Sequence, residues 1–84
     1  MQEIEKITCI KLYKKLKDKV RGKIFTSIRN DILMVYINEG RDIRYTYTIN
    51  NISKGILIDG LTAGDIAHKV LKDYKNFIMN KYLY

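Results

Sequence analysis

The most regular segment of the chain is Asp42-Ile43-Arg44-Tyr45-Thr46-Tyr47-Thr48-Ile49, in which polar and apolar residues alternate throughout. A period of two residues is typical of a β-strand with one buried face, because successive side chains of a strand point to opposite sides. We therefore expect a strand over residues 42–49. Its core-facing side chains would be Ile43, Tyr45, Tyr47 and Ile49.

Two further strands are predicted before this segment. Residues 32–37 read Ile-Leu-Met-Val-Tyr-Ile, an apolar run that favours a central strand with both faces covered or nearly so. Residues 24–28 form a shorter run that is rich in residues favoured in β-strands. Turn residues separate the strands at 29–31 and at 38–41, where Gly40 can take a positive φ. The three strands should form an antiparallel meander.

A helix is expected on each side of the meander. Over residues 4–20, helical spacing relates the apolar residues Cys9, Leu12, Tyr13, Leu16 and Val20. The glycine at position 22 would end this helix in a left-handed cap.

The last helix should run from Thr62 to the C-terminus, because Thr62 and Asp65 have the spacing of a capping box. Residues 51–58 fit a short helical turn, which we favour, or an edge strand. The predicted class is therefore α+β: a helix, a three-stranded meander, a short helical turn and a long helix, with both helices on one face of the sheet.

Length and composition limit the classes of protein. A chain of 84 residues fits a single domain over residues 1–84, and a homodimer would add stability to so small a core, so monomer and homodimer both stay open. No run of about 18 apolar residues occurs, and residues 1–6 lack the order of a signal peptide. One cysteine allows no intrachain disulfide. We expect a cytoplasmic protein without membrane contact.

No pattern for catalysis, a cofactor or a metal is found. His68 is the only histidine, and Cys9 lies in the apolar stripe of the first helix, where a buried small side chain is the expected role. The glycines at 55, 60 and 64 lack the Gly-Lys-Ser/Thr of a phosphate-binding loop. We therefore expect that the protein is not an enzyme and that it binds neither a cofactor nor a metal ion.

The positive charge of the chain is concentrated near its start. Eight of the sixteen Lys and Arg residues fall within the first 23 positions, which carry +5 of the net +7. The candidate nucleic-acid-binding residues are Lys11, Lys14, Lys15, Arg21 and Lys23. Two interpretations stay open: a solvated helix face, or a surface that contacts phosphates of nucleic acid or of a ribonucleoprotein without reading base sequence.

The helix–three strands–helix order resembles the double-stranded-RNA-binding domain in outline. That family contacts A-form RNA with its first helix, a loop and the basic start of its second helix. This chain departs from the family there, because residues 62–67 read Thr-Ala-Gly-Asp-Ile-Ala and contain no lysine. The resemblance implies a fold outline rather than an activity.

The last 35 residues or so are similar to small uncharacterised proteins of phages and prophages from AT-rich Gram-positive bacteria. The similarity lies in Asp59-Gly60-Leu61-Thr62-Ala63-Gly64-Asp65-Ile66-Ala67, Tyr74-Lys75-Asn76-Phe77-Ile78 and Tyr82. It implies a small, non-enzymatic accessory or host-takeover protein. Because the chain is basic, imitation of nucleic acid is disfavoured.

A second hypothesis makes the chain a phage-encoded inhibitor or accessory protein that binds a host protein, such as a defence or replication factor. The contact would use the polar side of the sheet or the C-terminal tail, since tyrosine is favoured in interfaces. The candidate partner-binding residues are Arg44, Thr46, Tyr82, Leu83 and Tyr84.

Overall fold

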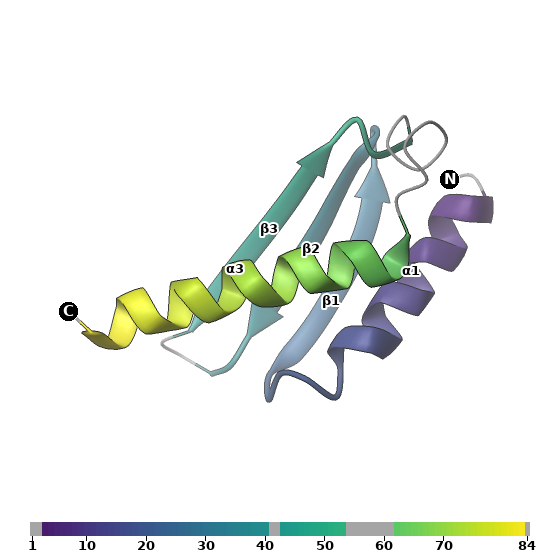
Figure 1. The fold of residues 1–84 in the computed structure, drawn as a ribbon. Coiled ribbons are helices and arrows are strands. Elements are labelled where there is room, and N and C mark those ends of the chain that lie inside the picture. The colour runs from purple at the N-terminus through teal and green to yellow at the C-terminus, as the bar shows by residue number, and fades with distance from the viewer. Residues whose placement is uncertain (1–2, 41–42, 54–61, 84) are drawn as a thin grey trace.

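The computed structural model of the chain describes residues 3–40, 43–53 and 62–83, of which residues 3–4 and 82–83 by their backbone only. It confirms the predicted α+β class. Figure 1 shows the elements, which are α1 (Glu3–Leu16), β1 (Lys23–Arg29), β2 (Ile32–Asn38), β3 (Arg44–Asn50) and α3 (Ala63–Leu83). Ile52 and Ser53 are helical. The rest of the segment predicted as a helical turn or edge strand falls outside the described residues.

The three strands form one antiparallel sheet in the order β1-β2-β3. Asn30 and Asp31 join β1 to β2 with φ angles of 50° and 65°, while Arg29 pairs with Ile32. Two central residues with positive φ make a type I′ turn, whose twist matches that of the strands. In the second turn Gly40 has a φ of 89°, and Glu39 N–H donates to the carbonyl oxygen of Ile43 at 2.9 Å.

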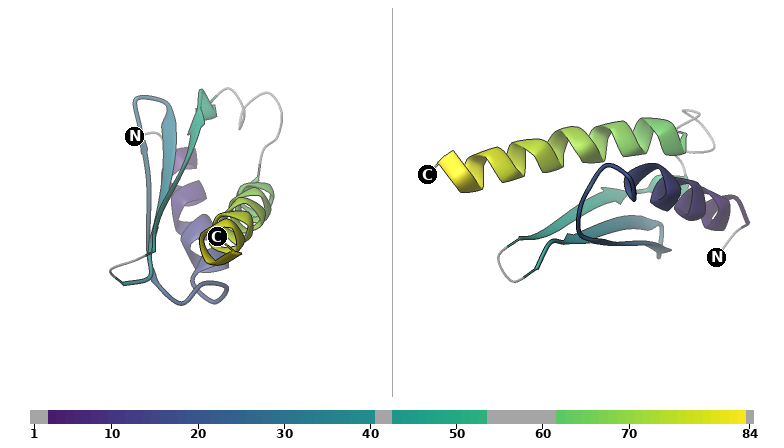
Figure 2. Two further views of the ribbon diagram at one scale, coloured as in Figure 1. Left: turned by 90° about the vertical axis from the view of Figure 1, so that its left-hand side faces the viewer. Right: turned by 90° about the horizontal axis from the view of Figure 1, so that it is seen from below.

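The sheet has one covered and one uncovered face. Both helices lie on the same side of the sheet in the two views of Figure 2, as predicted. We call the opposite side the outer face. Its residues, in the order of the chain, are Lys23, Phe25, Ser27, Arg29, Ile32, Met34, Tyr36, Asn38, Arg44, Thr46, Thr48 and Asn50. The prediction that β2 is covered on both faces is wrong, since no described element lies over Ile32 and Met34 and both are exposed.

The core lies between the inner face of the sheet and the two helices. Its fully buried large side chains are Leu12, Leu16, Leu33, Val35, Ile37, Ile52, Ile66 and Val70. α1 packs against β1 and α3, and α3 also contacts β3. The alternation of β3 is confirmed, because Ile43 and Tyr45 are buried while Arg44, Thr46 and Thr48 are exposed. No helix in the described ranges combines the length and apolar character that crossing a membrane needs.

α1 is shorter than the sequence predicts. Regular helix ends at Leu16 instead of residue 20, and Lys19 N–H donates to the carbonyl oxygen of Leu16 at 2.9 Å in the turn that follows. Tyr13, expected in the core stripe, is 44% exposed. Gly22 takes no positive φ; instead, a Cβ at this position would lie 2.3 Å from the carbonyl oxygen of Asn38. The glycine is needed for close approach of two backbones, not for a helix cap.

The capping box of α3 forms as predicted. The amide of Asp65 donates to Thr62 Oγ1 at 3.1 Å, and the amide of Thr62 donates to Asp65 Oδ2 at 3.2 Å. Farther along α3, Tyr45 of β3 donates its hydroxyl hydrogen to Asp73 Oδ2, and its ring packs edge-on against Tyr74 with centroids 5.1 Å apart. The capping box fixes the start of α3, and the contacts of Tyr45 hold the middle of α3 over the sheet.

Candidate functional site

Three of the predicted lysines meet the start of α3. Lys11, Lys14 and Lys15 lie at positions i, i+3 and i+4 of α1, a spacing that places side chains on one side of a helix. All three are exposed. Together with Thr62, Ala63 and Gly64 they line an open hollow of about 550 Å³, which we call the lysine hollow. A water molecule takes up about 30 Å³ in the liquid, so a hydrated phosphate group has room there.

The start of α3 contributes hydrogen-bond donors to this hollow. The first four amides of a helix have no partner within the helix, and the capping box satisfies those of Thr62 and Asp65. The amides of Ala63 and Gly64 remain, and no described residue accepts them. Aligned peptide dipoles give a helix N-terminus a partial positive charge. An anion in the lysine hollow would therefore meet both ammonium groups and backbone donors.

Lys15 lies close to Gly64 in the first turn of α3. A Cβ at Gly64 would lie 3.9 Å from Lys15 Cε, so the lysine side chain passes close to the first turn of α3. Asp65 follows Gly64 directly and is the acidic residue nearest to the lysine hollow along this part of the chain. Its carboxylate accepts hydrogen bonds from Thr62. Hydrogen bonds from the Thr62 backbone amide and hydroxyl, with smaller effects of Lys69 and His68, lower the pKa of Asp65. At neutral pH this carboxylate offsets part of the positive charge.

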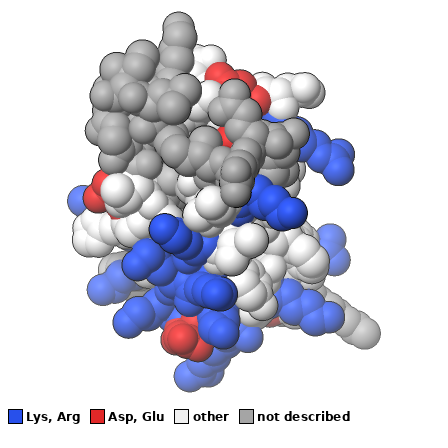
Figure 3. Space-filling view, turned by 90° about the vertical axis from the view of Figure 1, so that its right-hand side faces the viewer, with Lys and Arg blue, Asp and Glu red and all other residues white. Residues whose placement is uncertain are grey.

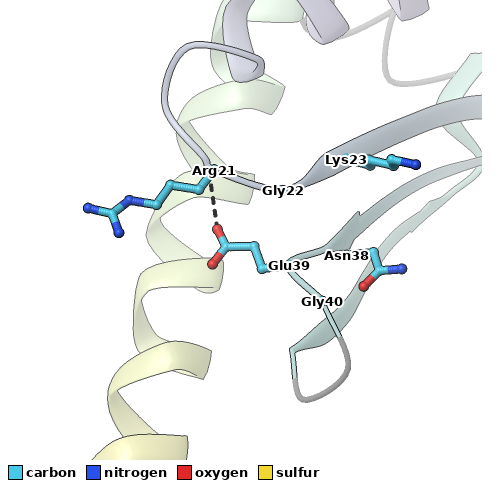
Figure 4. A pocket seen from close by; sticks show the side chains of 6 residues that line it. All are labelled: Arg21, Gly22, Lys23, Asn38, Glu39 and Gly40. Carbon is cyan, nitrogen blue, oxygen red and sulfur yellow. Dashed lines mark hydrogen bonds between the residues drawn. The ribbon is translucent and has the colours of Figure 1, made fainter.

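Arg21 and Lys23 lie apart from the lysine hollow. They line a second hollow, of about 630 Å³, with Gly22, Asn38, Glu39 and Gly40 (Figure 4). The Arg21 amide donates to Glu39 Oε1 at 3.2 Å, while the Arg21 guanidinium points away from that carboxylate and the Lys23 side chain points the other way along β1. The structure thus brings together Lys11, Lys14 and Lys15, and leaves the other two predicted residues elsewhere.

Basic side chains dominate the α1 side of the molecule. Figure 3 shows Lys and Arg atoms crowded over the lower part of this face, with one small group of acidic atoms among them. Such a concentration of one sign of charge raises the local concentration of an oppositely charged partner.

The residues predicted to bind a partner fall into two groups. Arg44 and Thr46 are exposed on the outer face, as expected. Tyr82 and Leu83 belong to the last turn of α3 by their backbone, and Tyr84 lies outside the described residues. The role of this tail stays a prediction.

Cys9 and His68 do not lie in the surroundings of a reactive thiol or a metal ligand among the described residues. Cys9 is buried, and burial raises the pKa of its thiol, which disfavours the reactive thiolate. His68 is exposed on α3. Among the described residues no three His, Cys, Asp or Glu side chains lie together as metal ligands would.

Phe25 and Tyr36 form a pair that was not predicted from the sequence. They are paired across β1 and β2 on the outer face, with ring centroids 6.1 Å apart and planes at 44°. The signal was present in the two-residue turn Asn30-Asp31, because a type I′ hairpin fixes the register and places these two residues opposite each other.

Comparisons with protein-family models, with curated proteins and with solved structures give no match for this chain. The similarity of its last 35 residues or so to phage and prophage proteins stays a prediction.

Proposed function

We propose that the chain is a nucleic-acid-binding module that holds phosphate groups in the lysine hollow. The observation that carries the proposal is the convergence of Lys11, Lys14 and Lys15 of α1 on the first turn of α3. These lysines occupy the place where the sequence lacks a basic start to the last helix. The basic side chains at this place come from α1.

The mechanism is phosphate recognition without base readout. Ammonium groups on flexible stems act as mobile point charges, and the amides of Ala63 and Gly64 add directional donors. Contacts of this kind position a polymer but carry no direct sequence information. We therefore expect similar affinity for unrelated sequences of the same polymer.

Binding should depend steeply on salt, because each neutralised phosphate releases condensed counterions. Three lysine–phosphate contacts on a duplex predict a slope of log K against log salt of about −2.7, which is about 40-fold between 50 and 200 mM. The measurement is fluorescence anisotropy with labelled double-stranded DNA and double-stranded RNA at those two concentrations.

The decisive variant is Lys14→Glu/Lys15→Glu. It should abolish duplex binding or lower the salt slope by about 2, because two phosphate contacts are lost. Lys75→Glu/Lys81→Glu is the matched control, since it makes the same change in net charge at exposed positions of α3 that do not line the lysine hollow. Circular dichroism checks that both variants keep the fold. Equal duplex affinity of the two variants would refute the site.

A further inference from the structure

The outer face of the sheet presents apolar residues that the fold does not use. Phe25 is 59% exposed and Met34 is 42% exposed, although Ile24 and Ile28 of β1 are buried and the alternate residues of β2 are fully buried. Burying a phenylalanine or methionine side chain contributes about 1.5–3 kcal/mol. The fold forgoes this contribution on the outer face, so these side chains are available to a partner.

The aromatic residues of this face form a single unit. Phe25 and Tyr36 are direct cross-strand partners, and their rings lie 6.1 Å apart between centroids. Met34 follows one row farther along β2, about 7 Å away along the strand. The exposed Phe25 ring, the half-buried Tyr36 ring tilted against it by 44° and the Met34 thioether form one apolar surface, on which a planar group can stack against a ring.

All charges of the outer face are positive. Lys23 and Arg44 lie in the row of the sheet next to the Phe25–Tyr36 pair, and Arg29 lies at the opposite end of β1. None of the twelve residues that define the outer face is acidic. Two acidic residues in the described parts of the adjoining turns accept hydrogen bonds: Glu39 accepts the Arg21 amide, and Asp31 accepts the Ser53 amide at 2.9 Å.

We propose that the outer face binds single-stranded nucleic acid, with bases stacked on Phe25 and Tyr36 and phosphates contacting Lys23 and Arg44. A cationic surface with exposed aromatic rings is the arrangement that holds single strands by stacking and phosphate contact. Bases within a duplex are stacked on each other and cannot reach these rings. The proposal concerns a surface on the opposite side of the sheet from the lysine hollow and does not depend on it.

Charge argues against a second copy of the chain as the occupant. An isologous dimer through this face would place Lys23, Arg29 and Arg44 of both copies in one interface, with no carboxylate among the residues of the outer face to compensate. A polyanion meets no such repulsion. A protein partner with acidic and apolar residues is the remaining alternative, and the test below separates it from a single strand.

The test uses tryptophan as a reporter, because the chain contains none. Phe25→Trp places the only indole on the outer face, and Met79→Trp places it at an exposed position of α3, on the helical side of the sheet. The probe is an oligothymidylate of roughly 12 nucleotides, within the usual range of site sizes. We expect it to quench the emission of Phe25→Trp and not that of Met79→Trp, and a duplex of equal length to quench neither.

Two further substitutions at position 25 separate stacking from plain apolar contact. Phe25→Tyr should bind the oligothymidylate like wild type, and Phe25→Leu, which keeps apolar area without an aromatic ring, should bind about 5- to 100-fold more weakly. Affinity of Phe25→Leu equal to that of wild type, or absence of quenching in Phe25→Trp at about 50 mM salt, where electrostatic contacts are strong, would overturn the proposal. The apolar face would then be assigned to a protein partner.

The same experiment distinguishes this inference from the proposed function. In the background of Lys14→Glu/Lys15→Glu, quenching of Phe25→Trp by the single strand should persist while duplex binding is lost. Loss of duplex binding alone supports the lysine hollow, and loss of single-strand quenching by Phe25→Leu alone supports the outer face. Quenching that disappears with the two lysines would contradict an independent surface.

Discussion

The two faces of the sheet are made by alternate residues of the same three strands, yet they differ in burial and in charge. Leu33 and Val35 of the inner face are 0% exposed, whereas their neighbour Met34 on the outer face is 42% exposed. The inner face is covered by two helices, and no described element covers the outer one. The core therefore uses only those apolar residues of β2 that lie on the inner face, and Ile32 and Met34 on the outer face stay exposed.

The largest effect should separate these neighbouring positions of β2. Leu33→Ala removes a fully buried side chain and leaves a cavity between sheet and helices, so we expect a loss of about 2–5 kcal/mol in the free energy of unfolding. Met34→Ala, one residue along, should change it by less than about 0.5 kcal/mol. Urea denaturation followed by circular dichroism measures both.

A comparable loss of stability for Met34→Ala would contradict the difference in burial between the two faces, because it would mean that the outer face is packed in solution. Concentration dependence of the unfolding midpoint would then show whether a second copy covers it.

Tyrosines on the two faces give a smaller test of the same difference. Tyr45, on the inner face, donates a hydrogen bond to Asp73, and burial followed by this bond raises the pKa of its phenol. Tyr45→Phe should lower the free energy of unfolding by about 1 kcal/mol, because the hydrogen bond is lost. Tyr36→Phe, on the outer face, should leave it nearly unchanged.

The pH dependence of the Tyr45 contribution follows from the direction of its shift. Since the pKa of Tyr45 in the folded state lies above that of the unfolded chain, its contribution is complete below about pH 10 and is lost as the pH rises further. The difference between wild type and Tyr45→Phe should therefore shrink in alkaline solution. A difference that is constant up to pH 11 would contradict the role given to the phenol.

Local patterns predicted much of the covered half of the molecule, although not the end of α1, the exposure of Tyr13 or the role of Gly22. The alternation of residues 42–49 gave the correct face to Ile43, Tyr45, Tyr47 and Ile49, and the spacing of Thr62 and Asp65 gave the correct start of α3. Both patterns are local, and each reflects a single physical cause: burial of one strand face, and hydrogen bonding of the first helical amides.

The exposure of the outer face could not be predicted from periodicity. The apolar run Ile32–Ile37 looks the same whether one face or both are covered, because composition does not say how many layers pack on a sheet.

Gly22 is explained by the carbonyl oxygen of Asn38, a contact between residues sixteen positions apart that no local pattern contains. The lysine hollow likewise depends on the packing of α1 against α3, which sets residues 11–15 beside residues 62–64.

The smallest effect concerns the start of the helix that covers the inner face. The pKa of Asp65 is lowered by its hydrogen bonds with Thr62, so the stability it contributes is complete above the pKa of about 3.9 of an unfolded aspartate and is lost as the pH falls through the lower value of the folded state. Wild type should therefore exceed Asp65→Asn in thermal midpoint at pH 7, and the gap should close as the pH falls below about 4. Asp18→Asn, which removes an exposed carboxylate from the turn after α1, shows what the change in net charge does by itself. A gap that stays constant down to pH 2 would mean that the carboxylate charge does not stabilise α3, and that the amide and hydroxyl of Thr62 are served equally well by an uncharged acceptor.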